Sequence, residues 1–226
     1  MSRRTLNHFA FFRFRKAHET MAAEDRAQFH RRWLEALRSA AAQVEVYQVF
    51  PTRADADILV WSALPYEDDQ TPRHFFEAFA KATLPFRRYV KSTEILWGMT
   101  RPSPYVGGKK PRGMDPIEGK RQSYLTLYPF VKTAEWYGMG REARQGMMNE
   151  HIRIGRQFPE VDQLLLYSFG LQDQEFVVVY EMEDLPRYSE LVSQLRGCDG
   201  RPFTERDTPI YTAVHHAAED TLALWE

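Results

Sequence analysis

A single histidine occupies the apolar side of an amphipathic stretch within residues 128–158. The residues that recur at i, i+4, i+7 and i+11 are Met147, His151, Ile154 and Phe158. This spacing places them on one face of a predicted helix. An imidazole in such a wall has two interpretations. It is either a core histidine hydrogen-bonded to backbone or to a carboxylate, or an axial ligand of a haem iron, which needs one neutral imidazole in apolar surroundings.

Composition limits the class of protein. The chain has 226 residues, 43% hydrophobic and 14% aromatic, which is enough for a sizeable core in one large domain or two small ones. The formal net charge of -1 gives no general attraction to nucleic acid or an anionic membrane, and no apolar run reaches the length of a bilayer span. The one cysteine, Cys198, excludes an intrachain disulfide and a multi-cysteine metal site. The N-terminus lacks a signal-peptide pattern, so we expect a cytoplasmic protein.

Hydrophobic periodicity predicts the same order of elements twice. In the first half we expect strands at residues 5–16, 44–50, 58–64 and 94–99, with helices at 24–42 and 71–89. In the second half we expect strands at 122–130, 163–170, 175–181 and 202–212, with helices at 136–157 and 184–196 and a short one within 215–226. Each half then has the β-α-β-β-α-β order of a ferredoxin-like unit, which predicts an α+β fold. The sheet faces without helices must be covered, so the two antiparallel sheets should pack together or close into a barrel.

A segment rich in proline and glycine, residues 101–121, separates the two halves. It divides the chain into residues 1–100, this linker, and residues 122–226. Its lysines and arginines suit either a solvated linker or a basic rim that meets an anionic ligand. The candidate histidine lies in the C-terminal half.

The chain resembles the chlorite dismutase superfamily, which includes the coproheme decarboxylases of haem synthesis. The pieces that carry this resemblance, in order, are TRPSPY, YPFVK, EWY, MMNEHIRIGRQF, LYSFGLQDQEFVVVYE and ERDTPIYT. The resemblance implies two fused ferredoxin-like halves and a homo-oligomer, usually a pentamer. It also implies one haem-type cofactor, haem b or coproheme, in the C-terminal half.

The resemblance gives roles to three residues. His151 matches the proximal histidine that ligates the iron. Lys132, nineteen residues earlier, matches a lysine in the hydrogen-bond network behind that histidine, although a surface lysine at a helix entry fits equally. Glu205 or Asp207 could supply the acidic end of this network. Tyr128 matches the tyrosine that coproheme decarboxylases oxidise to a radical, which attacks a propionate; a half-buried packing residue is the alternative.

The sequence departs from the chlorite dismutases on the distal side of the haem. They carry an arginine thirteen residues after the proximal histidine, where this chain has Leu164. An apolar side chain offers an oxyhalide neither charge nor hydrogen bond, so efficient chlorite decomposition is not expected. The resemblance to the coproheme decarboxylases implies conversion of coproheme to haem b with hydrogen peroxide as the favoured function. The propionates of coproheme need cationic or hydroxyl partners. The candidates are Arg101, Ser103, Tyr105, Arg121 and Arg206.

Two other functions stay open on the sequence. One is a haem-binding carrier, sensor or weak peroxidase that does not decarboxylate. The other is a metal-free ferredoxin-like assembly module, in which His151 packs in the core. We expect no nucleic-acid or membrane partner in either case.

Overall fold

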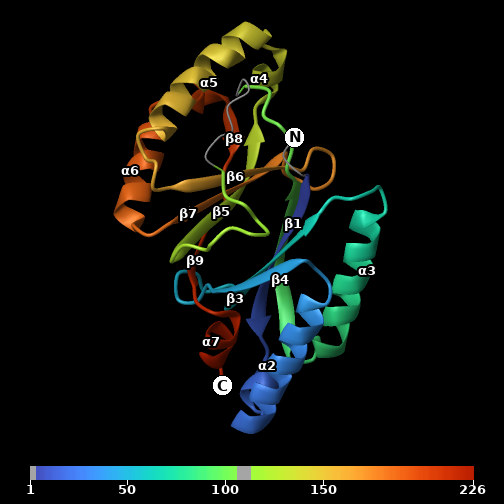
Figure 1. Cartoon of the computed structure of the whole chain (residues 1–226). Helices are drawn as coiled ribbons and strands as arrows, with labels where there is room; N and C mark the ends of the chain where they lie inside the picture. Colours follow the sequence, from blue (N-terminus) through green and yellow to red (C-terminus); the bar gives the residue numbers. More distant parts are fainter. Residues whose placement is uncertain (1–3, 106–112) are drawn as a thin grey trace.

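Two halves with the same order of elements make up the chain (Figure 1). The computed structural model describes residues 4–105 and 113–226. The first half comprises β1 (Thr5–Phe14), α1 (Lys16–Glu19), α2 (Ala23–Arg38), β2 (Gln43–Gln48), β3 (Ile58–Pro65), α3 (Thr71–Thr83), η1 (Leu84–Phe86) and β4 (Val90–Met99). The second comprises β5 (Tyr124–Lys132), α4 (Ala134–Gly138), α5 (Arg141–Gly155), β6 (Asp162–Tyr167), β7 (Phe176–Met182), α6 (Leu185–Arg196), η2 (Arg201–Phe203), β8 (Thr204–Arg206), β9 (Tyr211–His215) and α7 (Ala218–Ala223).

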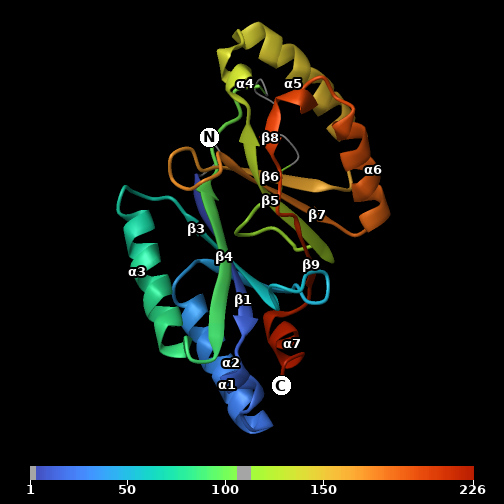
Figure 2. The same ribbon diagram turned by 180° about the vertical axis from the view of Figure 1, so that it is seen from behind.

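The strands form one continuous antiparallel array across both halves. Their hydrogen-bonded order is β7-β6-β4-β1-β3-β2-β9-β5-β8, and β5 also pairs with β7, so the pairing closes on itself. The α+β fold of two fused ferredoxin-like halves is therefore confirmed. Helices α2 and α3 cover the outer face of the first half, and α5 and α6 cover that of the second (Figures 1 and 2). Among the described residues, no helix is long and apolar enough to cross a membrane.

Three apolar clusters fill the layers of this fold. One lies beneath the helices of the first half, one between the two sheets, and one beneath α5 and α6. Strand β1 is buried along nearly its whole length because alternate side chains face different clusters. Phe9 and Phe11 point between the sheets, whereas Phe12 and Phe14 point to the helices. The helix-covered cluster of the second half is the one that can frame His151.

The structure differs from the expected elements where glycine or proline interrupts them. The helix expected at 136–157 is two helices, because Met139 and Gly140 are extended between α4 and α5. The strand expected at 202–212 is split into β8 and β9 around Pro209, which has no N–H for the ladder. The last helix, α7, packs back onto the first half, where Thr221 Oγ1 donates to the Val46 carbonyl at 3.0 Å.

The end of the linker is anchored rather than solvated. Gly113 forms an isolated bridge with Gln163 of β6, and the Met114 N–H donates to the Gln163 carbonyl at 3.3 Å. Met114 is buried between the sheets. Lys109, Lys110 and Arg112, which suit either a solvated linker or a basic rim, lie outside the described residues.

Arg121 ends this anchored segment in a buried ion pair. Its Nη1 lies 3.5 Å from Glu181 Oε1, and the side chains are 4% and 0% exposed. The guanidinium stacks over Trp61 at 4.8 Å, and Tyr47 donates its hydroxyl to Glu181 at 2.9 Å. Burial raises the pKa of Glu181 to about 7, and the Arg121 charge opposes that rise. The pair therefore ties the linker to both sheets.

Removal of one partner of this pair should destabilise the fold. Arg121→Met leaves a buried carboxyl without its cation, and we expect a loss of about 3–5 kcal/mol in the free energy of unfolding. The loss should be larger at pH 8.5 than at pH 6, where Glu181 can be protonated. Denaturant unfolding at the two pH values measures this. The double change with Glu181→Gln should recover most of the loss, and Arg73→Met in the exposed Arg73–Glu77 pair should change little. Equal effects of the two arginine changes would contradict the account.

A buried histidine in the first half should make the fold acid-sensitive. His8 lies among aromatic rings, with its centroid 4.5 Å from that of Phe79, and burial lowers its pKa to about 3. The unfolded chain, with an ordinary histidine pKa of about 6.5, binds more protons in this range. Stability should therefore fall as pH drops from about 6.5 toward 3, with a slope from His8 of about 1.4 kcal/mol per pH unit.

The variant His8→Phe keeps the ring and removes the proton site. Its free energy of unfolding should lose that part of the pH slope in denaturant titrations between pH 6.5 and 4. The exposed His74 provides the control, because His74→Phe should leave the slope unchanged. An unaltered slope in His8→Phe would show that His8 is protonated in the folded protein.

Candidate functional site

Helix α5 carries His151 over the sheet of the second half (Figure 1). Ile154 and Phe158, on the same side of the chain, are buried in the cluster beneath α5 and α6, and His151 is half-buried. Burial lowers the pKa of His151, the Lys132 charge lowers it further, and Glu150 acts in the opposite direction. The ring is therefore neutral at pH 7, the form that ligates metals.

No group in the described part of the chain hydrogen-bonds the His151 ring. A core histidine usually has such a bond. In the first half, for comparison, the Nε2 atoms of His18 and His30 lie 2.9 Å apart. Within residues 4–105 and 113–226, His151 thus lacks the backbone or carboxylate bond that the core interpretation calls for.

Lys132 ends β5 beside the same site. Its Nζ donates to the Gly200 carbonyl at 3.1 Å and lies 4.3 Å from the centre of the Trp136 ring. Burial and the nearby Arg201 lower the pKa of Lys132 to about 8. Because its charge acts on His151, the structure brings these two predicted residues together, and Lys132 is not a surface lysine.

Of the two acids proposed for the proximal network, only Asp207 is drawn into this face. Burial would raise its pKa, but hydrogen bonds from Arg201 and Arg196 outweigh burial and hold the pKa below its usual value. Glu205 is exposed on β8. Neither carboxylate hydrogen-bonds the His151 ring. The acid that acts on His151 is Glu150, which accepts the Asp199 N–H at 2.9 Å.

Tyr128 points from β5 toward the helices rather than between the sheets. It packs against the cluster beneath α5 and α6, with its ring centroid 6.4 Å from that of Tyr180. Burial raises the pKa of Tyr128 to about 12, and a hydrogen bond with Tyr180 opposes the rise. The phenol is therefore protonated at neutral pH. His151, Lys132 and Tyr128 all belong to the helix-covered face of the second half.

The start of the linker packs at one end of this face. The Arg101 guanidinium lies 4.2 Å from the centre of the Tyr167 ring, and the Tyr105 and Trp136 ring centroids are 6.4 Å apart. The Ser103 hydroxyl accepts the Tyr105 N–H at 3.3 Å. Tyr105 is therefore brought close to α4, and Arg101 lies against the end of β6.

The remaining candidates fall in different places. Arg206 is half-buried on β8, opposite Val131 of β5. The structure does not bring Arg121 to this face, because its guanidinium is buried with Glu181 between the two sheets. It does not bring Leu164 either. That side chain is 6% exposed and belongs to the cluster between the sheets, on the opposite face of β6.

Sequence reasoning missed three residues that the structure places on this face. Tyr180 of β7 stacks with Tyr128, and Gln163 of β6 donates its amide to the Tyr180 hydroxyl at 3.3 Å. Glu150 precedes the histidine directly. Glu150 could have been found from its position next to His151 in the sequence. Tyr180 could be found only from the strand register, which pairs Tyr128 with Val178 and so places Tyr180 diagonally across from Tyr128.

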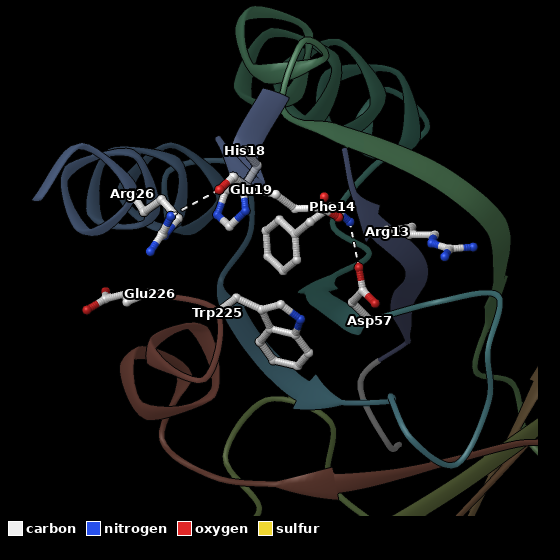
Figure 3. A pocket seen from close by; sticks show the side chains of 8 residues that line it. All are labelled: Arg13, Phe14, His18, Glu19, Arg26, Asp57, Trp225 and Glu226. Carbon is white, nitrogen blue, oxygen red and sulfur yellow. Dashed lines mark hydrogen bonds between the residues drawn. The ribbon is translucent and has the colours of Figure 1, made fainter. Parts of the chain in front are cut away.

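A separate hollow of about 350 Å³ lies in the first half (Figure 3). Phe14 and Trp225 form its apolar wall, with ring centroids 5.5 Å apart, and Arg13 and Arg26 lie on opposite sides of it. His18 also lines it, but its Nε2 is already paired with another imidazole. Side chains of both charges surround this hollow and no predicted site residue does, so it is not the candidate site.

Known proteins match both the chain and its fold. The chain is 28% identical to the coproheme decarboxylase of Mycolicibacterium smegmatis over 79% of this chain and 75% of that protein. It is 30% identical to the coproheme decarboxylase of Staphylococcus saprophyticus over 64% of this chain and 62% of that protein.

Solved structures of chlorite dismutase from Candidatus Nitrospira defluvii have the same fold. An arginine-to-lysine variant gives a TM-score of 0.85 at 22% identity, over 100% of this chain and 96% of that one. A complex with imidazole gives 0.84 at 22% identity, over 98% and 94%. The sequence profile of the chlorite dismutase family matches residues 19–216. The matched residues include α5 and its half-buried imidazole. The chain therefore belongs to the chlorite dismutase family.

Proposed function

We propose that this protein holds a haem-type group through His151 and converts coproheme to haem b with hydrogen peroxide. The observation that carries the proposal is the arrangement of His151, Lys132 and Tyr128 on one helix-covered face, from α5 and β5. Membership of the family supports the haem-type group, and the matching coproheme decarboxylases support the reaction.

The residues on this face suit such a group. A neutral imidazole without a hydrogen bond to any described residue can ligate iron without first losing a proton or a partner. The Lys132 charge helps to keep that imidazole neutral, and the bond from Lys132 to the Gly200 carbonyl holds the ammonium in place. Lys132 is then a positioning residue for His151.

Tyr128 is suited to give and take a hydrogen atom. Its raised pKa keeps the phenol protonated, so the O–H bond is present to be broken. Bound coproheme would supply the iron chemistry that reduces peroxide to water. A propionate that becomes a vinyl group loses CO₂, a proton and two electrons, and one peroxide molecule takes up two electrons and two protons to give two waters. Tyr128 gives up its phenolic hydrogen and regains one from the propionate CH₂ group.

The four carboxylates of coproheme need cationic or hydroxyl partners. Arg101, Ser103 and Tyr105 lie together at one end of the face, and Arg206 lies on β8. We assign propionate binding to these residues. Arg121 is left out because its charge is already paired with Glu181.

Chlorite decomposition is not part of the proposal. Leu164 cannot be the reason, because it lies on the other face of β6. The β6 side chains on the helix-covered face are Gln163, Leu165 and Tyr167. None of these carries the positive charge that would hold an anionic oxyhalide. The homo-oligomer, expected to be a pentamer, and the cytoplasmic location belong to the same proposal.

Loss of the imidazole should weaken binding of the haem-type group. In His151→Ala we expect the dissociation constant for coproheme to rise by at least about 100-fold, because the iron loses its protein ligand. Absorption titration of the purified protein with coproheme measures this. His74→Ala, an exposed histidine on α3, is the matched control and should bind as wild type does. Equal affinities in all three proteins would leave His151 as a packing residue.

Loss of the phenol should stop the chemistry but spare binding. Tyr128→Phe should take up coproheme normally and form haem b at least about 100-fold more slowly, a difference of about 2.7 kcal/mol in the barrier. Mass spectrometry of the pigment after addition of peroxide gives the rate. Tyr124→Phe, on the same strand and face, is the control.

Two outcomes would redirect the proposal. Full conversion by Tyr128→Phe would remove the radical role of Tyr128. Binding of coproheme by wild type without any haem b would instead favour a haem-binding protein or weak peroxidase.

A further inference from the structure

A row of tyrosines lines the helix-covered face of the second half. The Tyr128 and Tyr180 ring centroids lie 6.4 Å apart, and those of Tyr180 and Tyr188 lie 5.2 Å apart. Tyr180 is 3% exposed, so its hydroxyl depends on protein partners. The row connects the strand that carries Tyr128 to helix α6.

One hydrogen-bond partner of the Tyr180 hydroxyl is the side-chain amide of Gln163, whose nitrogen can only donate. Gln163 Nε2 donates to the Tyr180 hydroxyl oxygen at 3.3 Å. The backbone of Gln163 is held in turn, because its carbonyl accepts the Met114 N–H at 3.3 Å and the residue bridges to Gly113. The end of the linker therefore fixes the stretch of backbone from which the amide extends.

The hydrogen bond on the other side of Tyr180 follows from the first. Once its oxygen accepts from Gln163, the Tyr180 proton is free to donate. Tyr180 and Tyr128 are hydrogen-bonded to each other. Because the Tyr180 oxygen already accepts from Gln163, Tyr180 is the donor and Tyr128 the acceptor of this bond. Tyr188 packs against Tyr180, but its hydroxyl bonds Thr126 and is not a member of this hydrogen-bond chain.

We propose that Gln163 and Tyr180 are positioning residues that orient the Tyr128 hydroxyl. The chain runs from the Gln163 amide to the Tyr180 oxygen, and from the Tyr180 proton to the Tyr128 oxygen. The Tyr128 proton is then directed away from Tyr180 and is available to a bound reactant. The role of these residues in catalysis rests on the proposed function. The series of hydrogen bonds itself is present in the protein without any bound group.

The test starts with the protein free of coproheme. Tyrosine labelled with ¹³C at Cζ gives one NMR resonance per tyrosine, and Tyr128→Phe identifies that of Tyr128 by its loss. Tyr180→Phe keeps the ring and removes the donor, so the Tyr128 resonance should shift. Gln163→Glu keeps the shape and replaces the donor by an acceptor. The Tyr180 proton should then turn to the carboxylate, and the Tyr128 resonance should shift in the same direction.

Tyr188→Phe is the matched control, because it removes a hydroxyl beside Tyr180 that lies outside the chain. Its Tyr128 resonance should stay in place. The proposed series of hydrogen bonds would be wrong if the Tyr128 resonance did not move in Tyr180→Phe and Gln163→Glu. It would also be wrong if the resonance moved equally in Tyr188→Phe.

The catalytic part is tested with coproheme and peroxide. Both variants should bind coproheme as wild type does and form haem b about tenfold more slowly, the value of one net hydrogen bond of about 1.4 kcal/mol. Wild-type rates in variants with shifted resonances would overturn the positioning role. If wild type itself forms no haem b, the proposed function and this catalytic role both fail. The shifts of the Tyr128 resonance would still show the hydrogen bonds from Gln163 through Tyr180 to Tyr128. The two failures are thus distinguishable.

Discussion

The candidate site depends on a neutral imidazole that α5 holds against the sheet without a hydrogen bond to any described residue. Burial and the Lys132 charge both favour the uncharged ring. A neutral imidazole that no described group hydrogen-bonds keeps its ring nitrogen available to ligate a metal.

The two halves share one architecture but use their buried histidines differently. In the first half, His8 is enclosed by the rings of α3, and His18 and His30 bond each other. These rings complete the packing beneath the helices. In the second half, Lys132 and a row of tyrosines lie on the face beneath α5 and α6, and His151 has no such aromatic enclosure among the described residues. The first half thus uses its buried histidines for packing, whereas the second half carries the candidate site.

The order of elements and the inward side of α5 could be predicted from the sequence because local periodicity determines both. The apolar runs of the strands, alternating at residues 44–50, and the spacing around His151 predicted the ferredoxin-like order and the inward side of α5. The face occupied by Leu164 could not be predicted, because QLLLY is apolar on both faces of β6 and carries no alternation. The burial of Arg121 could not be predicted either. A basic residue in a segment of prolines and glycines gives no sign of a partner on β7. Tyr180 needed the strand register, which only the closed sheet provides.

The central claim is that His151 bonds directly to the iron of a bound haem-type group. Resonance Raman spectroscopy of the reduced, coproheme-loaded protein tests this bond most directly. The account predicts an iron–imidazole stretching band that shifts when the histidines are labelled with ¹⁵N and that is absent from His151→Ala. A band that persists unchanged in His151→Ala, or a wild-type spectrum without any ¹⁵N-sensitive band, would contradict it.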